Sequence, residues 1–361
     1  MGTNAQIHAF VSFPDARFTE SLIEKALSSS NAKLYRNISD VPKDAESVLQ
    51  WSTYDEILHE LTMQRPRHVL SSTYVIRKSL IRKHFLHQSI RNYLAKRPDS
   101  ILAQSIPPTW HIEIVHSDEL DEMWMDDLYD LEQILSDATS GIEAPKWFIL
   151  KPGMADRGMG IRLFHSKEGL QEIFESFERD EDEDEVDQDG IEEDATAVVT
   201  SQLRHFVVQE YLLSPLLIDP RENIGTGISP GHLQGRKFHL RAYCVAQGAL
   251  KVHLFTRILA LFSSMEYAPP SAETEGSSDL SAHLTNTALQ EQHGEENVRL
   301  LQELIGSRML SADSRSVEIV RLTEEDVNLI IDEVAASLGE AFRACLTSPV
   351  HFQVIVCTSM F

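Results

Sequence analysis

Apolar residues recur along the chain with two different spacings, and each spacing predicts a different element. Alternating or consecutive apolar positions predict strands at residues 5–13, 69–74, 147–150, 160–164 and 206–209. Helical spacing predicts helices at residues 19–27, 76–95, 118–137, 169–177 and 325–346. Residues 238–262 predict a β-hairpin that turns at Gln247-Gly248. The opening order of strand, turn and helix favours a mixed α/β (α+β) protein.

The 361 residues are enough for more than one packed unit. We expect a small N-terminal α/β domain at residues 1–70, a central lobe at 71–212 and a C-terminal lobe at 213–361. The central lobe would contain an acidic insertion at residues 178–197. From Glu178 to Asp194 this segment has twelve carboxylates and one arginine. Few apolar groups are present there, so we predict that the insertion is disordered.

Charge is unevenly distributed along the chain. The formal net charge of −24 argues against nucleic-acid binding by the protein as a whole. Residues 62–98, however, contain no aspartate or glutamate. Their basic side chains are Arg65, Arg67, Arg77, Lys78, Arg82, Lys83, Arg91, Lys96 and Arg97. The 65–97 stretch therefore predicts a basic surface that would suit an acidic partner.

Cysteines and apolar runs bear on the cellular compartment. Cys244, Cys345 and Cys357 lack metal-ligand spacing, and their odd number favours reduced thiols in a cytoplasmic protein. The first residues lack the apolar core of a signal peptide. No run approaches the ~20 apolar residues that a membrane span needs. We therefore expect a cytoplasmic protein with no membrane segment.

A lysine followed by a glycine-rich turn is the first candidate site. An apolar run ends at Lys151, and the next begins at Ile161 after a turn that contains Gly153, Gly158 and Gly160. Lysine supplies a compact positive charge for a phosphate, and glycines let backbone N–H groups approach its oxygens. A hairpin without any ligand has the same pattern, so this turn alone does not decide between the two.

Lys237, His239 and Arg241 share one face of a predicted strand. Three cationic groups on one face repel each other unless an anion or a carboxylate lies there, although a solvated outer face is equally open. Arg257 stands alone in an apolar strand, and a buried charge needs a partner. It would therefore face the same anion or a carboxylate.

Two polar segments have alternative interpretations as well. Gln209 to Leu212 follow a predicted strand and belong either to the core or to a slot for an adenine base. His283, Thr285 and Asn286 either cap a helix or contact a ribose or phosphate.

In their order along the chain, these segments resemble the tubulin–tyrosine ligase family of ATP-grasp enzymes. The matching segments are Tyr74–Leu80, Lys151–Ile161, Gln209–Leu217, Arg236–Arg241, Arg257 and His283–Asn286. The resemblance covers residues 73–286 and the helix after them, and the sequence as a whole resembles fungal members of the family. It implies an ATP-grasp fold, in which two α+β lobes clamp ATP. It also implies ligation of an amino acid to a protein carboxylate through an acyl-phosphate.

The resemblance assigns roles to individual residues and implies ATP and Mg²⁺ as cofactors. Lys151 and Lys78 would contact the phosphates beneath a loop that contains Ala155, Gly158 and Gly160. The catalytic cations would be Lys237, Arg241 and Arg257. The remaining nucleotide contacts would be the adenine hinge of Gln209, Glu210, Tyr211 and Leu212, and the ribose side of His283, Thr285 and Asn286.

Two departures from the family pattern change the expectation. His239 stands where the ligase has an acidic residue, so either amino-acid selection or acceptor chemistry would differ. Family members also continue past a segment like Pro349–Gln353 into an Asp-bearing strand and a final Glu-x-Asn, whose carboxylates hold magnesium. Val354–Phe361 contains no carboxylate. We therefore expect a C-terminal lobe that is truncated and lacks metal ligands, in a chain that is inactive or weakly active.

Three functions are compatible with these patterns. The first is a monomeric ligase that acts on an acidic protein tail, such as the C-terminus of tubulin. The second is a catalytically inactive scaffold that binds an acidic tail, or RNA, through residues 65–97. RNA has less support, because no basic motif with interleaved aromatics is present. The third is a different ATP-grasp peptide ligase, which His239 keeps open.

Overall fold

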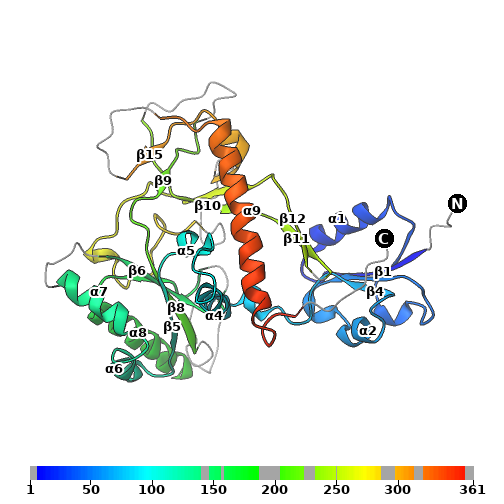
Figure 1. Ribbon diagram of the computed structural model, residues 1–361, viewed down its shortest axis with the longest axis horizontal. Helices are drawn as coiled ribbons and strands as arrows, with labels where there is room; N and C mark the ends of the chain where they lie inside the picture. Colours follow the sequence, from blue (N-terminus) through cyan, green and yellow to red (C-terminus); the bar gives the residue numbers. More distant parts are fainter. Residues whose placement is uncertain are drawn as a thin grey trace. The chain divides into compact units, whose positions relative to one another are not determined.

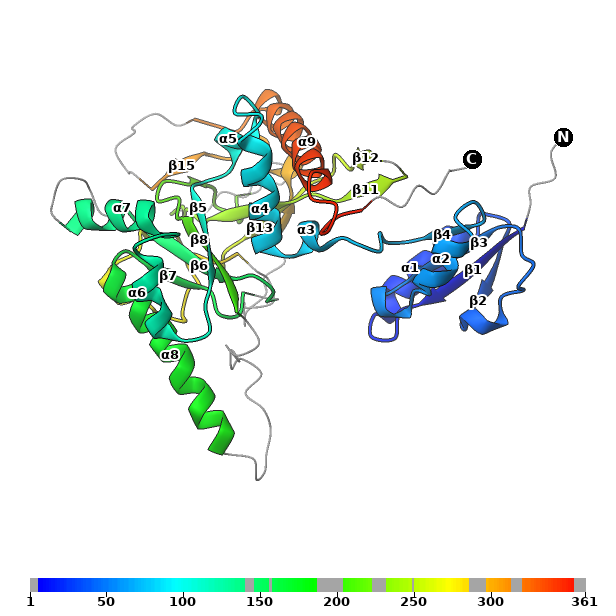
Figure 2. The same ribbon diagram turned by 60° about the horizontal axis from the view of Figure 1, so that its bottom comes forward.

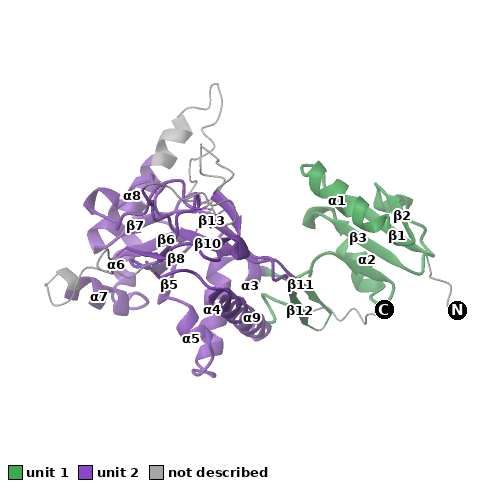
Figure 3. Ribbon diagram, turned by 90° about the horizontal axis from the view of Figure 1, so that it is seen from above, with its two compact units in different colours: residues 1–77, 245–253, 349–361 green, residues 78–244, 254–348 purple. Residues whose placement is uncertain are grey.

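The chain folds into two compact units (Figure 3). The computed structural model describes residues 6–139, 146–155, 158–186, 204–222, 232–248, 250–285, 297–312 and 320–353. The first unit comprises residues 1–77, 245–253 and 349–361, and the second comprises residues 78–244 and 254–348. The predicted division of residues 71–361 into a central and a C-terminal lobe stays a prediction.

The first unit contains a parallel sheet with a helix on each face. Its strands are β1 (Ile7–Ser12), β2 (Ala32–Tyr35), β3 (Val48–Ser52) and β4 (Val69–Ser71), in the order β2-β1-β3-β4. Alternation along β1 sends Ala9 and Val11 to one face, where they meet Ile23 of α1 (Arg17–Leu27). Phe10 faces the other side, near Leu61 of α2 (His59–Gln64). α1 and α2 accordingly lie on opposite faces (Figure 1). The predicted strand–helix opening is present.

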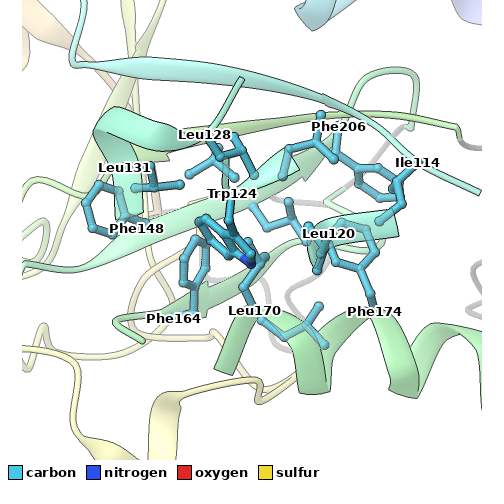
Figure 4. Close-up of a cluster of buried hydrophobic side chains, with 14 of the residues drawn as sticks. Ile114, Leu120, Trp124, Leu128, Leu131, Phe148, Phe164, Leu170, Phe174 and Phe206 are labelled. Carbon is cyan, nitrogen blue, oxygen red and sulfur yellow. The ribbon is translucent and has the colours of Figure 1, made fainter. Parts of the chain in front are cut away.

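An antiparallel sheet forms the first part of the second unit. Its strands are β5 (Thr109–Glu113), β6 (Phe148–Pro152), β7 (Arg162–Phe164) and β8 (His205–Glu210), in the order β5-β8-β6-β7. α6 (Leu120–Met123), α7 (Tyr129–Thr139) and α8 (Lys167–Val186) bury their apolar side chains against one face (Figure 4). The alternate residues of β6 and β8, among them Lys151 and Gln209, are left for the opposite face.

Helices α4 (Lys83–Leu94) and α9 (Glu324–Leu346) pack side by side (Figure 2). Ile90 and Tyr93 of α4 share a buried cluster with Ala344 of α9 and with Leu102 of α5 (Leu102–Ser105). Tyr93 Oη donates a hydrogen bond of 2.8 Å to Glu340 of α9. The other end of α9 buries Val327 in a second apolar cluster. α9 therefore links α4 to the sheet described next.

The remaining strands build three small sheets. β10 (Phe238–Arg241), β13 (Leu259–Phe262) and β14 (Val298–Leu300) pair in that order. β11 (Cys244–Gln247) pairs with β12 (Lys251–Leu254), and β9 (Leu216–Leu217) pairs with β15 (Leu310–Ser311). The antiparallel register aligns Phe238 with Phe262. The hairpin predicted over residues 238–262 is confirmed.

Three predicted elements differ from the structure. The helix predicted at 76–95 is divided into α3 (Lys78–Ile81) and α4, because Arg82 is extended between them. The helix predicted at 118–137 is interrupted by a turn between α6 and α7, which lets Trp124 and Leu128 enter the same core. Residues 178–186, predicted to be disordered, continue α8. Glutamate favours helix, and Glu178 is fixed by hydrogen bonds from the N–H and hydroxyl of Ser117. Residues 187–197 of the insertion lie outside the described residues.

Two further findings concern the cysteines and the helices. Cys345 is a buried free thiol and Cys244 an exposed one, whereas Cys357 lies outside the described residues. Within the described ranges, no helix has the length and apolar content to cross a membrane.

Candidate functional site

Two lysines, Lys151 and Lys237, define the candidate site. Lys151 stands on β6 and Lys237 lies just before β10. Burial lowers the pKa of Lys151 to about 8, and the charge of Lys83 adds to this effect. Burial likewise lowers the pKa of Lys237 to about 8, with a contribution from the charge of Lys151. Neither Lys151 nor Lys237 forms an ion pair with any residue that the structure describes. The pair is therefore a site of unbalanced positive charge, which suits an anion.

A hydrogen-bond chain fixes the ammonium group of Lys151. Its Nζ donates to Gln209 Oε1 at 2.8 Å, and Gln209 Nε2 donates to Thr109 Oγ1 at 3.0 Å. The antiparallel pairing of β5, β8 and β6 makes this possible, because it aligns Gln209 with both Thr109 and Ile149. The sheet thus holds a cation at a defined position without neutralising it.

A second chain holds Lys237 against an aromatic ring. Lys237 Nζ donates to Tyr211 Oη at 2.9 Å and lies 4.0 Å from the centre of the same ring. Tyr211 Oη lies 3.0 Å from His283 Nδ1. Burial, followed by the charge of Lys237, lowers the pKa of His283 to about 4. The imidazole is therefore neutral near pH 7, so we assign Tyr211 as the donor and His283 Nδ1 as the acceptor.

The apolar surroundings of Tyr211 form a compact cluster. Tyr211 is buried with Trp147, Ile149, Leu163 and Tyr267. Burial raises the pKa of the Tyr211 phenol, so it stays protonated. Through Tyr211 this apolar cluster borders Lys237.

The phosphate loop, defined as residues 153–160, connects β6 to β7. Gly158 and Gly160 have φ values of 86° and 69°, a left-handed conformation that glycine adopts without strain. Ala155 lies at the end of the described first part of the loop, and its carbonyl accepts a hydrogen bond of 3.4 Å from Lys83 Nζ. Residues 156 and 157 lie outside the described residues.

The two faces of β10 differ in chemistry. Phe238 and Leu240 pack against an apolar core, which leaves His239 and Arg241 for the opposite face. His239 Nδ1 pairs with Thr285 Oγ1, and burial, followed by the charge of Arg241, lowers the pKa of the imidazole. Arg241 is exposed. No acidic group of the described residues pairs with His239 or Arg241.

Several predicted residues stand apart from the lysine pair. Lys78 is exposed in α3, and no contact joins it to Lys151 or Lys237 among the residues described. Leu212 is 60% exposed, and its contact with an adenine base stays a prediction. Glu210 follows Gln209 with its backbone N–H bonded to Pro108 O at 2.9 Å. Asn286 lies outside the described residues.

The prediction that Arg257 is buried in an apolar strand is wrong. β13 begins at Leu259, and Arg257 lies before it as an exposed residue. Its charge contributes to lowering the pKa of Glu303, for which the hydrogen bond from Arg299 is the main cause. An exposed guanidinium remains hydrated and needs no buried partner.

The basic stretch at residues 65–97 is divided between the two units. Arg65 donates to the carbonyl oxygens of Lys43 and Ala45, and Lys83 bonds to the phosphate loop. The exposed cations of this stretch in the second unit include Arg91, Lys96 and Arg97. The stretch is therefore not one uniform surface.

Sequence reasoning missed Lys83 and Thr109 as members of the site. In the sequence, Lys83 was only one of several cations in residues 62–98, which contain no aspartate or glutamate. Its contact with the loop depends on how α4 packs on the sheet. No sequence pattern marked Thr109 as a site residue, because its contact with Gln209 arises from the pairing of β5 with β8.

The described residues contain no group of three or more histidine, cysteine, aspartate or glutamate residues that could hold a metal. The buried carboxylates of Asp219 and Glu222 are paired with Arg221 and Arg308.

Comparisons with known proteins identify relatives of the chain. The profile of the tubulin-tyrosine ligase family matches residues 57–352. The probable tubulin–tyrosine ligase C12B10.04 of Schizosaccharomyces pombe is 36% identical over 360 residues, covering 97% of this chain and 79% of the relative. The probable tubulin–tyrosine ligase PBY1 of Saccharomyces cerevisiae is 36% identical over 268 residues, which are 71% of this chain and 33% of that protein.

A solved structure extends the likeness to the fold. The crystal structure of the C-terminal domain of K. lactis Pby1, an ATP-grasp enzyme interacting with the mRNA decapping enzyme Dcp2, matches with a TM-score of 0.61 and 25% identity. The match covers 98% of this chain and 79% of that one. These comparisons support the ATP-grasp fold and give no support to the predicted truncation or impairment. The chain belongs to the tubulin-tyrosine ligase family.

Proposed function

We propose that the chain is an ATP-dependent ligase that joins an amino acid to a protein carboxylate through an acyl-phosphate. The pair of half-buried lysines, Lys151 and Lys237, carries this proposal. Both ammonium groups are desolvated and have no ion-pair partner among the described residues, so a triphosphate would supply the missing negative charge. Phosphoryl transfer is catalysed mainly by positioned cations, which this site provides.

The proposed reaction has two steps. A carboxylate oxygen of the acceptor attacks the γ-phosphorus of ATP, and ADP leaves with the electrons of the broken P–O bond. The amine of the amino acid then attacks the acyl carbon, and inorganic phosphate leaves. The amine nitrogen loses protons as the amide forms. Lys151 and Lys237 would hold the phosphates in the first step, with Arg241 next to the acyl-phosphate in the second.

The nucleotide would lie along β8 and the segment after it. Gln209 to Tyr211 would border the adenine, and His283 and Thr285 would lie on the ribose side. Arg257 and Lys78 are exposed in this structure and stay proposed contacts of the nucleotide. The acceptor would be an acidic protein tail, drawn to exposed cations such as Arg91, Lys96 and Arg97.

The experiment is an incorporation assay with matched variants. Purified protein is incubated with Mg-ATP, one labelled amino acid at a time, and peptides that end in acidic tails, including a tubulin tail. We expect ADP formation that requires both amino acid and peptide, and incorporation that is lost in Lys151→Met and Lys237→Met but kept in the exposed control Lys251→Met. ATP-independent labelling, or equal labelling by Lys151→Met, would show that this site does not catalyse ligation.

A scaffold without catalysis is the second candidate. The observation in its favour is that K. lactis Pby1 is described as interacting with the mRNA decapping enzyme Dcp2. A scaffold would bind its partner without ATP and equally well after Lys237→Met. Substituting Arg91, Lys96 and Arg97 together would instead weaken binding, in a salt-dependent manner if the partner is RNA.

A further inference from the structure

The N-terminus of α4 is bonded directly to the start of the phosphate loop. Arg82, in the N-cap position, provides no side-chain cap. The backbone N–H of Lys83 donates to Gly153 O at 3.0 Å. The side chain of Lys83 turns to the same segment, where Nζ donates to Pro152 O at 3.0 Å and to Ala155 O at 3.4 Å. One residue thus holds three carbonyl groups at the loop entrance, defined as Pro152–Ala155.

A stack of three imidazoles supports the loop entrance from another side. The histidine stack consists of His84 of α4, His111 of β5 and His205 of β8. The ring centres of His84 and His205 are 4.3 Å apart, and His111 Nε2 lies 3.2 Å from His205 Nδ1. Gly153 N–H donates to His205 O at 2.6 Å. A Cβ at Gly153 would collide with the His84 ring and lie 2.8 Å from His205 O. Only glycine fits between the strand and the stack.

The orientation of the carbonyl groups matters for an anion. A carbonyl oxygen that faces a phosphate repels it, whereas a backbone N–H attracts it. Lys83 draws the carbonyls of Pro152 and Ala155 toward α4, so these oxygens are already occupied by a cation. Lys83 is also close enough to Lys151 for its charge to act on that ammonium group. Its position therefore affects both the loop and the lysine pair.

We propose that Lys83 is a positioning residue for the nucleotide: it holds the loop entrance against α4 and the histidine stack, and thereby orients the phosphate loop before ATP binds. The inference rests on the proposed nucleotide site. In this assignment Lys83 acts through the backbone of the loop, and Lys151 and Lys237 contact the phosphates themselves.

The test measures the loop without nucleotide and the binding of nucleotide separately. Hydrogen–deuterium exchange is followed in a peptide that covers residues 148–161, with a peptide from α7 as the internal control for folding. Mg-ATP affinity is measured by calorimetry on the same samples. The variants are Lys83→Met, Lys83→Arg, Lys151→Met and the exposed control Lys251→Met. Removing both side-chain hydrogen bonds in Lys83→Met should speed exchange of the loop by roughly tenfold.

The full set of outcomes distinguishes the two proposals. We expect Lys83→Met to speed loop exchange and weaken Mg-ATP binding, Lys83→Arg to restore most of both, and Lys251→Met to change neither. Lys151→Met should abolish binding and leave loop exchange unchanged. If loop exchange in Lys83→Met equals that in Lys251→Met, the positioning role is overturned, whatever happens to affinity. If the wild-type protein binds no nucleotide, the proposed function fails, while loop exchange still decides whether Lys83 holds the loop.

Discussion

Replacing Lys237 by methionine should stabilise the ligand-free protein while removing nucleotide binding. Lys237 is desolvated and close to a second cation, and its pKa falls from 10.5 to about 8. A shift of this size corresponds to about 3 kcal/mol of cost for the charged form at neutral pH. Methionine has a similar length and no charge, so this cost disappears in the variant.

Part of the gain is offset by lost contacts. Lys237 Nζ donates to Tyr211 Oη and lies over the Tyr211 ring. A hydrogen bond and a cation–π contact of this kind contribute about 1–2 kcal/mol together. Tyr211 keeps its hydrogen bond to His283, so no buried hydroxyl is left unpaired. The expected net gain is about 1–2 kcal/mol in the free energy of unfolding near pH 7.

The pH dependence provides the sharper test. The pKa of Lys237 is lower in the folded state than in the unfolded state, so the unfolded chain binds more protons between pH 8 and pH 10.5. Wild-type stability should therefore rise across this window relative to Lys237→Met. The advantage of the variant should be largest below pH 8 and shrink above pH 9.

Urea unfolding followed by tryptophan fluorescence measures this difference. Trp110, Trp124 and Trp147 all lie in the second unit, so the signal reports mainly on that unit. The exposed Lys96→Met, in the same unit, is the matched control and should change stability by less than about 0.5 kcal/mol. The reasoning is refuted if Lys237→Met is less stable than Lys96→Met at pH 7, or if the difference between them does not change with pH.

Three further predictions concern the loop, the core and acid stability. Gly153→Ala should destabilise the protein by about 1–3 kcal/mol and weaken Mg-ATP binding, because the new Cβ collides with the histidine stack. Urea unfolding measures the change in stability and calorimetry the change in affinity, and an unchanged affinity would contradict the prediction. Leu131→Ala should lower the free energy of unfolding by about 2–5 kcal/mol, because Leu131 is fully buried in the core shown in Figure 4. The exposed Leu212→Ala should lower it by less than about 0.5 kcal/mol, and equal losses in the two variants would contradict the prediction. Burial, followed by the charges of Arg91 and His111, lowers the pKa of His87 to about 4, so the free energy of unfolding should fall as the pH drops from 6.5 toward 4. Urea titrations at each pH should show a smaller loss in His87→Asn, and an acid profile identical to that of the wild type would contradict this role of His87.

The sequence predicted those parts of the fold that depend on local patterns. Consecutive apolar residues located β6 and β8, and helical spacing located α9, whose start is marked by the capping pair Thr323 and Asp326. The break between α3 and α4 was not predictable. The backbone N–H of Lys83 bonds to Gly153, seventy residues away in the chain, and no local pattern records such a contact.

The same distinction applies to the candidate site. Lys151, Gln209, Tyr211, Lys237 and His283 were predicted as members, and the structure connects them in two hydrogen-bond chains. The predicted burial of Arg257 was wrong, because apolar neighbours in the sequence do not by themselves bury a side chain. Lys83 and Thr109 could not be found, since their roles come from packing on the sheet and from strand register. The order of motifs along the chain predicts which residues form the site, whereas the residues that support them can be identified only from the folded structure.

Calorimetric titration with Mg-ATP at pH 8, in two buffers with different ionisation enthalpies, tests the central claim most directly. At this pH Lys151 and Lys237 are each about half protonated, so a triphosphate bound between them should draw up to about one proton from the buffer. The account predicts binding with this proton uptake, reduced affinity in Lys151→Met and Lys237→Met, and no change in Lys251→Met. Absence of binding, binding without proton uptake, or wild-type affinity in both lysine variants would contradict a phosphate site at this pair.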